Sequence, residues 1–400
     1  MTESKKRMGL RAALMLLVAA LAVVAAGCGG SDDSSSSSTQ IEGLGTTLEE
    51  IQANAKTEGE VNLVNWAGYV EPAWVKPFEQ QTGCKVNSKV AGSSDEMVTL
   101  IKTGNYDGLS ASGDATLRLI ASKDVAPVNF DLIPNYANVF EGLKNQSYNT
   151  VDGVSYGVAH GRGANLLIWN KDDVTPSPTT WDVVWDANSP AAGKISVYDS
   201  PIYIADAALH LKTTQPDLGI DNIYELDEDQ FNAAVSLLKE QKKIVGEYWS
   251  DATKQIQSFT SGDSTAGTTW QYQVNTLQGA TDPVPVEAIL PEEGSTGWSD
   301  TWMIATTAKN PNCMYLWMDY IISPAANAAA TESFGEAPVS AEACAKTADK
   351  EHCTKYHAED EEYFKKIYYW TTPVADCGDD RGDVCKDYSE WTTAWTEIKG

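Results

Sequence analysis

The chain alternates between short apolar runs and segments in which apolar residues recur at helical spacing. The strand-like runs of its first third lie at residues 61–66, 84–92 and 106–112. The segments with helical periodicity lie at 47–59, 71–83, 93–104 and 113–124. Strands and helices that alternate at this spacing predict an α/β fold with parallel layers.

The residues at the ends of two predicted helices support this assignment. Pro72 lies in the first turn of the helix at 71–83 and Gly83 ends it, which is the asymmetry that helices favour. Ser93 or Ser94 is a suitable N-cap for the next helix, and acidic residues follow in its first turn.

The same alternation continues to about residue 335. Further strands are expected at 156–170, where glycines interrupt the run, and at 193–200, 264–273 and 284–305. Further helices are expected at 179–186, 201–214, 227–243, 252–262, 311–323 and 325–335. Residues 345–400 are rich in cysteine, acidic and aromatic residues and have less clear periodicity.

The N-terminal residues have the pattern of an export signal. Basic residues precede an apolar run at 12–26, which is shorter than the roughly 20 residues of a membrane span. AAGC at 25–28 resembles a bacterial lipobox, with Ala25 in place of the usual Leu. We therefore expect a lipoprotein signal peptide at 1–27, lipidation of Cys28, and a flexible Ser/Gly tether at 28–46. The alternative is an ordinary secretory signal followed by an unrelated cysteine.

Composition and charge narrow the class of protein. A hydrophobic fraction of 42% and a charged fraction of 21% are typical of a folded protein, and 400 residues predict a bilobal or two-domain body. The formal net charge of -27 makes nucleic acid and anionic lipid poor partners. The acidity either favours cationic ligands or only keeps an exported protein soluble.

Six cysteines remain after Cys28: Cys84, Cys313, Cys344, Cys353, Cys377 and Cys385. An even number in an exported chain predicts disulfides, and six cysteines allow 15 pairings. Short separations favour Cys344–Cys353 and Cys377–Cys385, which would leave Cys84 for Cys313. His352 and His357 flank Cys353, but their spacing matches no zinc pattern well, so no metal site is expected.

Catalytic motifs are absent from the sequence. It contains no G-x-S-x-G, no H-E-x-x-H and no G-x-x-x-x-G-K-[ST], and HGRGAN at 160–165 lacks the third glycine of a dinucleotide fingerprint. Four histidines leave few general bases. We therefore expect a protein that is not an enzyme and has no cofactor. The RGD tripeptide at 381–383 matches an integrin-binding motif, and its ordinary interpretation is a chance occurrence.

Several aromatic residues lie at predicted strand ends, where loops are usually polar. Trp66 and Tyr69 follow the first strand, Trp270 follows TAGTT, and Trp298 lies in GSTGWSDTW beside Asp300. Ligands of open α/β sheets bind at the carboxyl ends of strands, so these residues should converge there. Aromatic faces and a carboxylate together suit an organic cation, through cation–π attraction and a charged hydrogen bond. The alternative for each tryptophan alone is core packing.

A family resemblance rests on these segments. The lipobox, the strand ending NWAGYV, EPAWVKPFEQQTG, TTWDVVWD, PEEGSTGWSDTWMIA and FGEAPVS together resemble bacterial extracellular solute-binding proteins of ABC importers. The likeness is greatest to the spermidine/putrescine-binding family and covers roughly residues 59–340.

The resemblance implies the architecture and the partners. It implies a two-lobed, type II periplasmic-binding-protein-like α/β fold, in which a ligand binds in the cleft between the lobes. One lobe would comprise 47–160 and 300–343, and the other 161–299 and 344–400. The expected partners are a small organic amine, polyamine-like, and an ABC permease. The protein would be a monomer, held by its lipid at the outer face of the cytoplasmic membrane.

The resemblance also implies the ligand-binding residues. Trp66 and Tyr69 would form the wall of the first lobe, with Ser112 as a polar contact. Asp114 stands where the family often has an aromatic residue. The rings of the second lobe would be Trp270 and Trp298, with Asp300 as the partner of an amine and Glu336 facing the cleft.

Three departures from the family pattern concern charge. Gly68 replaces a residue that is often acidic, Ser200 and Tyr203 replace acids after the strand at 193–200, and Arg162 replaces an aromatic residue. A monoamine, an amino acid-like zwitterion with its carboxylate on Arg162, or another small solute is therefore an alternative ligand. Arg162 in a structural ion pair is an equally weighted interpretation. An extracellular enzyme or an adhesion module is the alternative from another class.

Overall fold

The computed structural model of the protein describes residues 41–400. The predicted signal peptide, the predicted lipidation site Cys28 and most of the predicted tether lie outside the described residues. Within residues 41–400, no helix is both long enough and apolar enough to cross a membrane.

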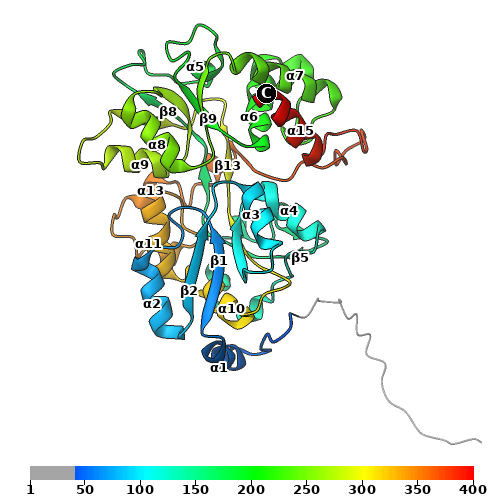
Figure 1. Cartoon of the computed structure of the whole chain (residues 1–400), viewed down its shortest axis with the longest axis vertical. Coiled ribbons are helices and arrows are strands. Elements are labelled where there is room, and N and C mark those ends of the chain that lie inside the picture. The colour runs from blue at the N-terminus through cyan, green and yellow to red at the C-terminus, as the bar shows by residue number, and fades with distance from the viewer. Residues whose placement is uncertain (1–40) are drawn as a thin grey trace, which may run out of the picture. The chain divides into compact units, whose positions relative to one another are not determined.

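The first lobe is built on a five-stranded sheet with the order β2-β1-β3-β14-β6. Its strands β1 and β2 lie side by side in Figure 1. Its strands are β1 (Glu60–Asn65), β2 (Lys85–Val90), β3 (Gly108–Ala111), β6 (Val158–Ala159) and β14 (Thr301–Ile304). β1 is parallel to β2 and β3, whereas β14 is antiparallel to both β3 and β6. The parallel strands therefore end at one edge of the sheet.

Helices of this lobe begin and end where the sequence pattern predicts. They are α1 (Leu48–Glu58), α2 (Pro72–Thr82), α3 (Ser94–Ile101), α4 (Gly113–Ala121), α10 (Pro311–Ile321) and α11 (Pro324–Phe334). Ser93 caps α3 by accepting a hydrogen bond from the backbone N–H of Glu96. Gly83 ends α2 with a φ of 81°, a conformation that glycine adopts without strain. The predicted alternation of strands and helices is thus confirmed here.

The second lobe has its own five-stranded sheet, in the order β10-β9-β11-β8-β12. Its strands are β8 (Leu166–Asn170), β9 (Ile195–Tyr198), β10 (Val245–Trp249), β11 (Ala266–Thr269) and β12 (Val286–Ile289). Its helices are α5 (Asp182–Trp185), α6 (Ile204–Thr214), α7 (Glu228–Gln241), α8 (Ala252–Ser261), α9 (Gln271–Gln278) and α15 (Tyr388–Lys399). α7 begins with a capping box between Asp227 and Gln230.

A three-stranded sheet, β15-β13-β7, lies where the chain passes between the lobes. Its strands are β7 (Gly163–Ala164), β13 (Ser295–Trp298) and β15 (Ile367–Tyr369). The glycine-interrupted segment predicted at 156–170 is divided among three sheets, as β6, β7 and β8. This segment therefore crosses from the first lobe to the second. The exact residues that divide the lobes remain a prediction.

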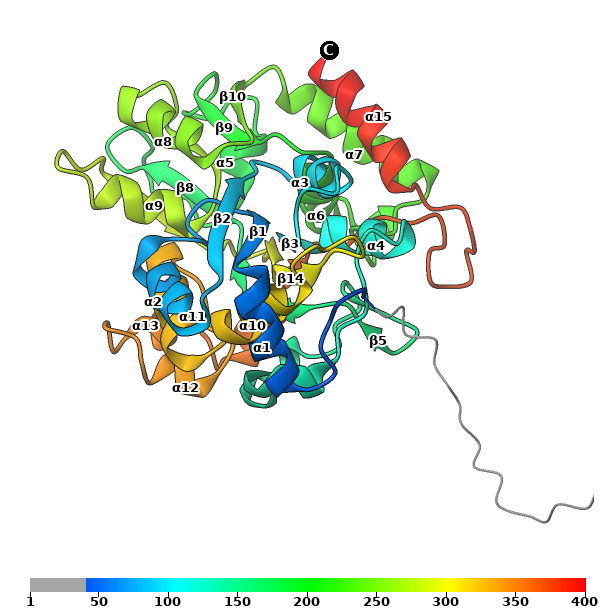
Figure 2. The same ribbon diagram turned by 60° about the horizontal axis from the view of Figure 1, so that its bottom comes forward.

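The C-terminal residues cross back between the lobes and end on the second. They contain α12 (Ala341–Cys344), α13 (His352–Lys355) and α14 (Glu361–Phe364) before β15 and α15. α15 packs beside α7 (Figure 2). The minor elements are β4 (Thr150–Val151), β5 (Val154–Ser155), η1 (Phe130–Leu132), η2 (Pro134–Asn138), η3 (Glu141–Leu143), η4 (Pro201–Tyr203) and η5 (Pro216–Leu218).

Three disulfides join Cys84 to Cys313, Cys344 to Cys353, and Cys377 to Cys385. These are the pairs that the short sequence separations favour. The sequence pattern does not predict α9, β10, β15, α15 or the short elements at 130–155, 216–218 and 341–364. Residues 271–273, expected as the end of a strand, instead begin α9.

Candidate functional site

Aromatic residues from both lobes meet at the ends of their strands. Trp66 directly follows β1, Trp270 follows β11, Trp298 is the last residue of β13, and Trp370 follows β15. Together with Phe334 at the end of α11, they line a cavity of about 10 Å³. We call these five side chains the aromatic cage. Ser112 and Asp300 supply the polar part of the lining.

The rings of the cage close on one another across the two lobes. The Trp66 and Trp270 ring centroids lie 5.8 Å apart, edge to face. Trp270 lies 6.2 Å from Trp298, which lies 6.0 Å from Phe334. The indole N–H of Trp270 donates to Asn165 Oδ1 at 3.1 Å, which fixes the orientation of that ring. Because the free volume is no more than one water needs, a ligand enters only when these rings separate.

The register of the first sheet places a carboxyl group beside the cage. Thr301 of β14 pairs with Ala111 of β3, so Asp300 lies next to Ser112. The Ser112 hydroxyl donates to Asp300 Oδ1, and the Tyr69 hydroxyl donates to Asp300 Oδ2 at 2.6 Å. Asp300 is only 3% exposed and has no Lys or Arg partner among the ion pairs of residues 41–400. Burial raises the pKa of Asp300 to about 7, although both hydrogen bonds oppose the shift.

A second buried carboxyl group lies behind Tyr69. Glu336 Oε2 is 3.4 Å from the Tyr69 hydroxyl and 3.4 Å from the indole nitrogen of Trp298. Tyr69 has one hydroxyl proton, and it is directed to the closer Asp300. Burial, and then the charge of Asp300, raise the pKa of Glu336 well above its usual value. The same surroundings that enclose Tyr69 and Trp298 thus favour the protonated form of Glu336.

His160 is held in one neutral tautomer beside Glu336. The indole N–H of Trp302 donates to His160 Nδ1 at 2.9 Å, so Nδ1 is an acceptor and the ring proton is on Nε2. Nε2 lies 3.4 Å from Glu336 Oε1. Burial lowers the pKa of His160 to about 3. His160 therefore supplies no positive charge to neutralise the two carboxyl groups.

Asp114 lies near the cage without lining it. Its carboxyl accepts a hydrogen bond from Ser94 Oγ at 2.7 Å, and burial raises its pKa to about 6. The intervening Gly113 is required by the C-terminal segment. A Cβ at Gly113 would lie 1.7 Å from the backbone oxygen of Trp370, so only glycine lets Trp370 reach the cage here.

Three predicted binding residues lie away from the cage. Arg162 pairs with Glu361 at 2.7 Å and donates to the backbone oxygen of Ala358, which is the structural ion pair considered above. It lines a separate cavity of about 230 Å³ behind Trp298. Ser200 and Tyr203 are buried in the second lobe, where the Tyr203 hydroxyl accepts from Gln241. The structure brings together Trp66, Tyr69, Ser112, Trp270, Trp298 and Asp300, with Glu336 behind Tyr69.

The sequence pattern missed Trp370, Phe334 and His160. Trp370 had a usable signal, because IYYW at 367–370 is an apolar run that ends in tryptophan, as VNLVNW does. Phe334 directly precedes Gly335 in a segment that the resemblance includes. His160 follows β6 and no local pattern distinguishes it.

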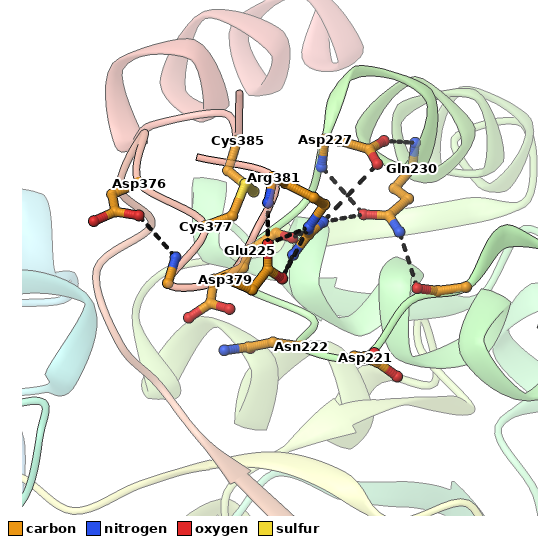
Figure 3. A network of polar contacts seen from close by, with 12 residues as sticks. Asp221, Asn222, Glu225, Asp227, Gln230, Asp376, Cys377, Asp379, Arg381 and Cys385 are labelled. Atoms are coloured by element: carbon orange, nitrogen blue, oxygen red, sulfur yellow. Dashed lines mark hydrogen bonds and ion pairs between the residues drawn. A yellow bond between two sulfur atoms is a disulfide. The ribbon is translucent and has the colours of Figure 1, made fainter. Parts of the chain in front are cut away.

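The RGD tripeptide forms part of a structural network on the second lobe. The Arg381 guanidinium donates to Asp379 at 3.0 Å, to the backbone oxygen of Glu225 and to Gln230, both at 3.1 Å (Figure 3). These contacts hold the loop closed by Cys377 and Cys385 against the start of α7. Because Arg381 is committed to these partners, the tripeptide does not present a free guanidinium for adhesion.

Known proteins share this sequence pattern and fold. The family model for bacterial extracellular solute-binding protein matches residues 73–356. The putrescine/cadaverine-binding protein of Pseudomonas aeruginosa is 24% identical over 295 residues, covering 70% of this chain and 79% of that protein. The spermidine/putrescine-binding periplasmic protein of Escherichia coli is 23% identical over 287 residues, covering 71% and 78%.

A solved structure confirms the fold. The putative spermidine/putrescine ABC transporter from Listeria monocytogenes superposes with a TM-score of 0.71 at 18% sequence identity. The match covers 85% of this chain and 99% of that one. The expected two-lobed, type II periplasmic-binding-protein-like fold is thus shown.

Proposed function

Because the chain belongs to the bacterial extracellular solute-binding protein family, we propose that it captures a small organic amine and delivers it to an ABC permease. The observation that carries the proposal is Asp300, a buried carboxyl group in an aromatic cage without a cationic partner among residues 41–400. A buried carboxylate without a counter-charge is costly, and an ammonium group is the partner that the site lacks.

The cage suits the rest of such a ligand. Indole faces attract a desolvated cation and also pack against methylene groups. Ser112 and Tyr69 hold the carboxyl of Asp300 in place, so that it pairs with an ammonium group without rearranging. The names of the two relatives, which bind putrescine together with cadaverine or spermidine, support an amine as the ligand class.

Capture requires the lobes to separate and close again. Trp66 belongs to the first lobe and Trp270 to the second, and their contact closes the cage. The chain crosses between the lobes near β7, β13 and β15, which are the places where a hinge would bend. The closed form would be the one presented to the permease. We further propose that lipidation of Cys28 holds the protein at the outer face of the cytoplasmic membrane.

The test is a titration of the purified protein with putrescine, spermidine, γ-aminobutyrate and glycine betaine, followed by thermal unfolding. A ligand at one hundred times its Kd adds about 2.7 kcal/mol to the free energy of unfolding. At least one of the amines should therefore raise the melting temperature by several degrees. No shift with any amine contradicts the proposed function.

Affinity for a cationic ligand should fall in acid. The ligand binds the ionised form of Asp300, whose pKa of about 7 in the free protein lets protons compete below that pH. One competing proton weakens binding by about tenfold per pH unit. Calorimetric titrations should thus show constant affinity above pH 7 and a decline below it. Asp114, with a pKa of about 6, adds a weaker dependence in the same direction.

The variant that removes the titrating group is the control. Asp300→Asn binds more weakly at every pH, and its affinity should lose most of the decline between pH 7 and pH 5. An unchanged pH profile in this variant would show that another group titrates.

A further inference from the structure

We propose that the cage accepts one ammonium group and an apolar remainder, so that its preferred ligand is a small organic monoamine rather than a diamine or polyamine. This inference rests on the proposed function and makes its ligand class more specific. It is carried by the distribution of charge around the cage, which differs between the two lobes.

The carboxyl groups near the cage all belong to one side. Asp300 lies between β13 and β14, Glu336 follows α11, and Asp114 is on α4, so all three lie against the first lobe. Only Asp300 lines the cavity. Glu336 contacts the Tyr69 hydroxyl and the Trp298 indole nitrogen and lines the separate cavity behind Trp298. The carboxyl of Asp114 is turned to Ser94.

The wall formed by the second lobe is aromatic throughout. Trp270 packs edge to face on Trp249 with ring centroids 5.0 Å apart, and it contacts Tyr198 at 5.5 Å. Tyr198 in turn stacks on Trp370 at 5.6 Å. The cavity lining includes no carboxylate from this lobe.

The acids at the strand ends of the second lobe are engaged elsewhere. Asp199, which follows β9, pairs with Lys399 and accepts from the indole N–H of Trp395. Asp251 caps α8 by accepting from the backbone N–H of Thr253. Asp206 on α6 accepts from Thr296 Oγ1 at 2.9 Å. None of these three carboxylates lines the cavity.

A second opening beside the cage does not supply a partner either. A cavity of about 220 Å³ lies outside the Trp66–Trp270 contact and includes Glu96 and Asp251 in its lining. Glu96 pairs with Lys89 at 3.5 Å and accepts from the backbone N–H of Gly92. Trp66 and Trp270 line both cavities, so their rings stand between these acids and Asp300.

The consequence follows from the cost of burying charge. A first ammonium group pairs with Asp300. A second ammonium group, at the far end of the ligand, would be transferred from water to a surface of indole rings that has no carboxylate. Cation–π attraction offsets the cost of that desolvation only in part. A methyl group at the same place gains from apolar contact with those rings.

Putrescine and n-pentylamine make a matched test. Each has six heavy atoms in a chain, and they differ only in whether the far end is an ammonium or a methyl group. Calorimetric titration of the purified protein should give at least tenfold tighter binding of n-pentylamine. Equal affinities, tighter binding of putrescine, or no binding of n-pentylamine would overturn the inference.

The titrations separate failure of the ligand class from failure of the proposed function. If putrescine binds at least as tightly as n-pentylamine, the proposed function stands and only the ligand class is wrong. If no amine gives heat or a melting shift, the proposed function itself fails. As a control for the site, Asp300→Asn should weaken n-pentylamine by at least tenfold. An undiminished affinity in that variant would place binding outside the cage and overturn the inference.

Discussion

Replacing Asp300 by asparagine is expected to weaken the binding of an organic cation by about 2–5 kcal/mol, the cost of removing one partner of a buried charge pair. Asparagine keeps the shape of the side chain but offers no negative charge. The Ser112 and Tyr69 hydroxyls still have one amide oxygen to contact. Calorimetric titration of the variant and the parent protein with the same amine measures the difference.

Stability distinguishes loss of the site from loss of the fold. A pKa raised by burial means that the folded state disfavours ionised Asp300, so this carboxylate lowers the free energy of unfolding above pH 7. The destabilisation is absent below the pKa of Asp300 in the unfolded chain, where the carboxyl is protonated in both states. It grows as the pH rises and is complete above the pKa of Asp300 in the folded protein. Asp300→Asn should therefore melt at the same temperature as the parent protein, or higher, at pH 8.

Asp206 offers a matched control for this prediction. Burial raises its pKa to about 7 as well, and it accepts a hydrogen bond from a hydroxyl, but it does not line the cage. Asp206→Asn should change the free energy of unfolding in the same direction. Amine affinity should stay within about twofold, because Asp206 shares no partner with the cage and its substitution acts independently of the site. Equal losses of affinity in both variants would mean that general charge, not contact with Asp300, attracts the ligand.

The sequence was most informative where local signals agree. The strands and helices between residues 47 and 124 have caps, terminal glycines and periodicity that favour one structure, and they were predicted. The missed elements lack such agreement, except that α15 begins with a capping box between Asp387 and Glu390. α9 is short and largely polar, and α15 is rich in Thr and Trp, which favour helices weakly. β15 has three residues and depends on pairing with β13.

The candidate site divides in the same way. Trp66, Trp270 and Trp298 lie at the ends of strands that the sequence pattern predicts, and the rule for open α/β sheets then brings them together. Trp370 comes from β15, a strand that tertiary pairing creates. Arg162 is held away from the cage by its ion pair with Glu361, which lies 199 residues further along the chain. No local sequence pattern shows that contact.

Removing the Cys84–Cys313 disulfide should cost the most stability of the three. The bond closes a loop of 229 residues between the start of β2 and α10, whereas Cys377–Cys385 closes one of 8 residues. Loop-closure entropy in the unfolded chain predicts losses of about 5.5 kcal/mol for the long loop and about 2.5 kcal/mol for the short one. Denaturant titration of the paired Cys→Ala variants measures both values.

The affinity of the disulfide variants for an amine is a second measurement beside their stability. Cys84 and Cys313 lie within the first lobe, and neither lines the cage. The folded Cys84→Ala/Cys313→Ala protein should therefore bind an amine with the affinity of the parent protein, even though it unfolds at a lower denaturant concentration. If both paired variants lost the same stability, native-state packing rather than loop entropy would determine the cost. If affinity fell as well, the bond would also position the strand end that carries Trp66, because β1 pairs directly with β2.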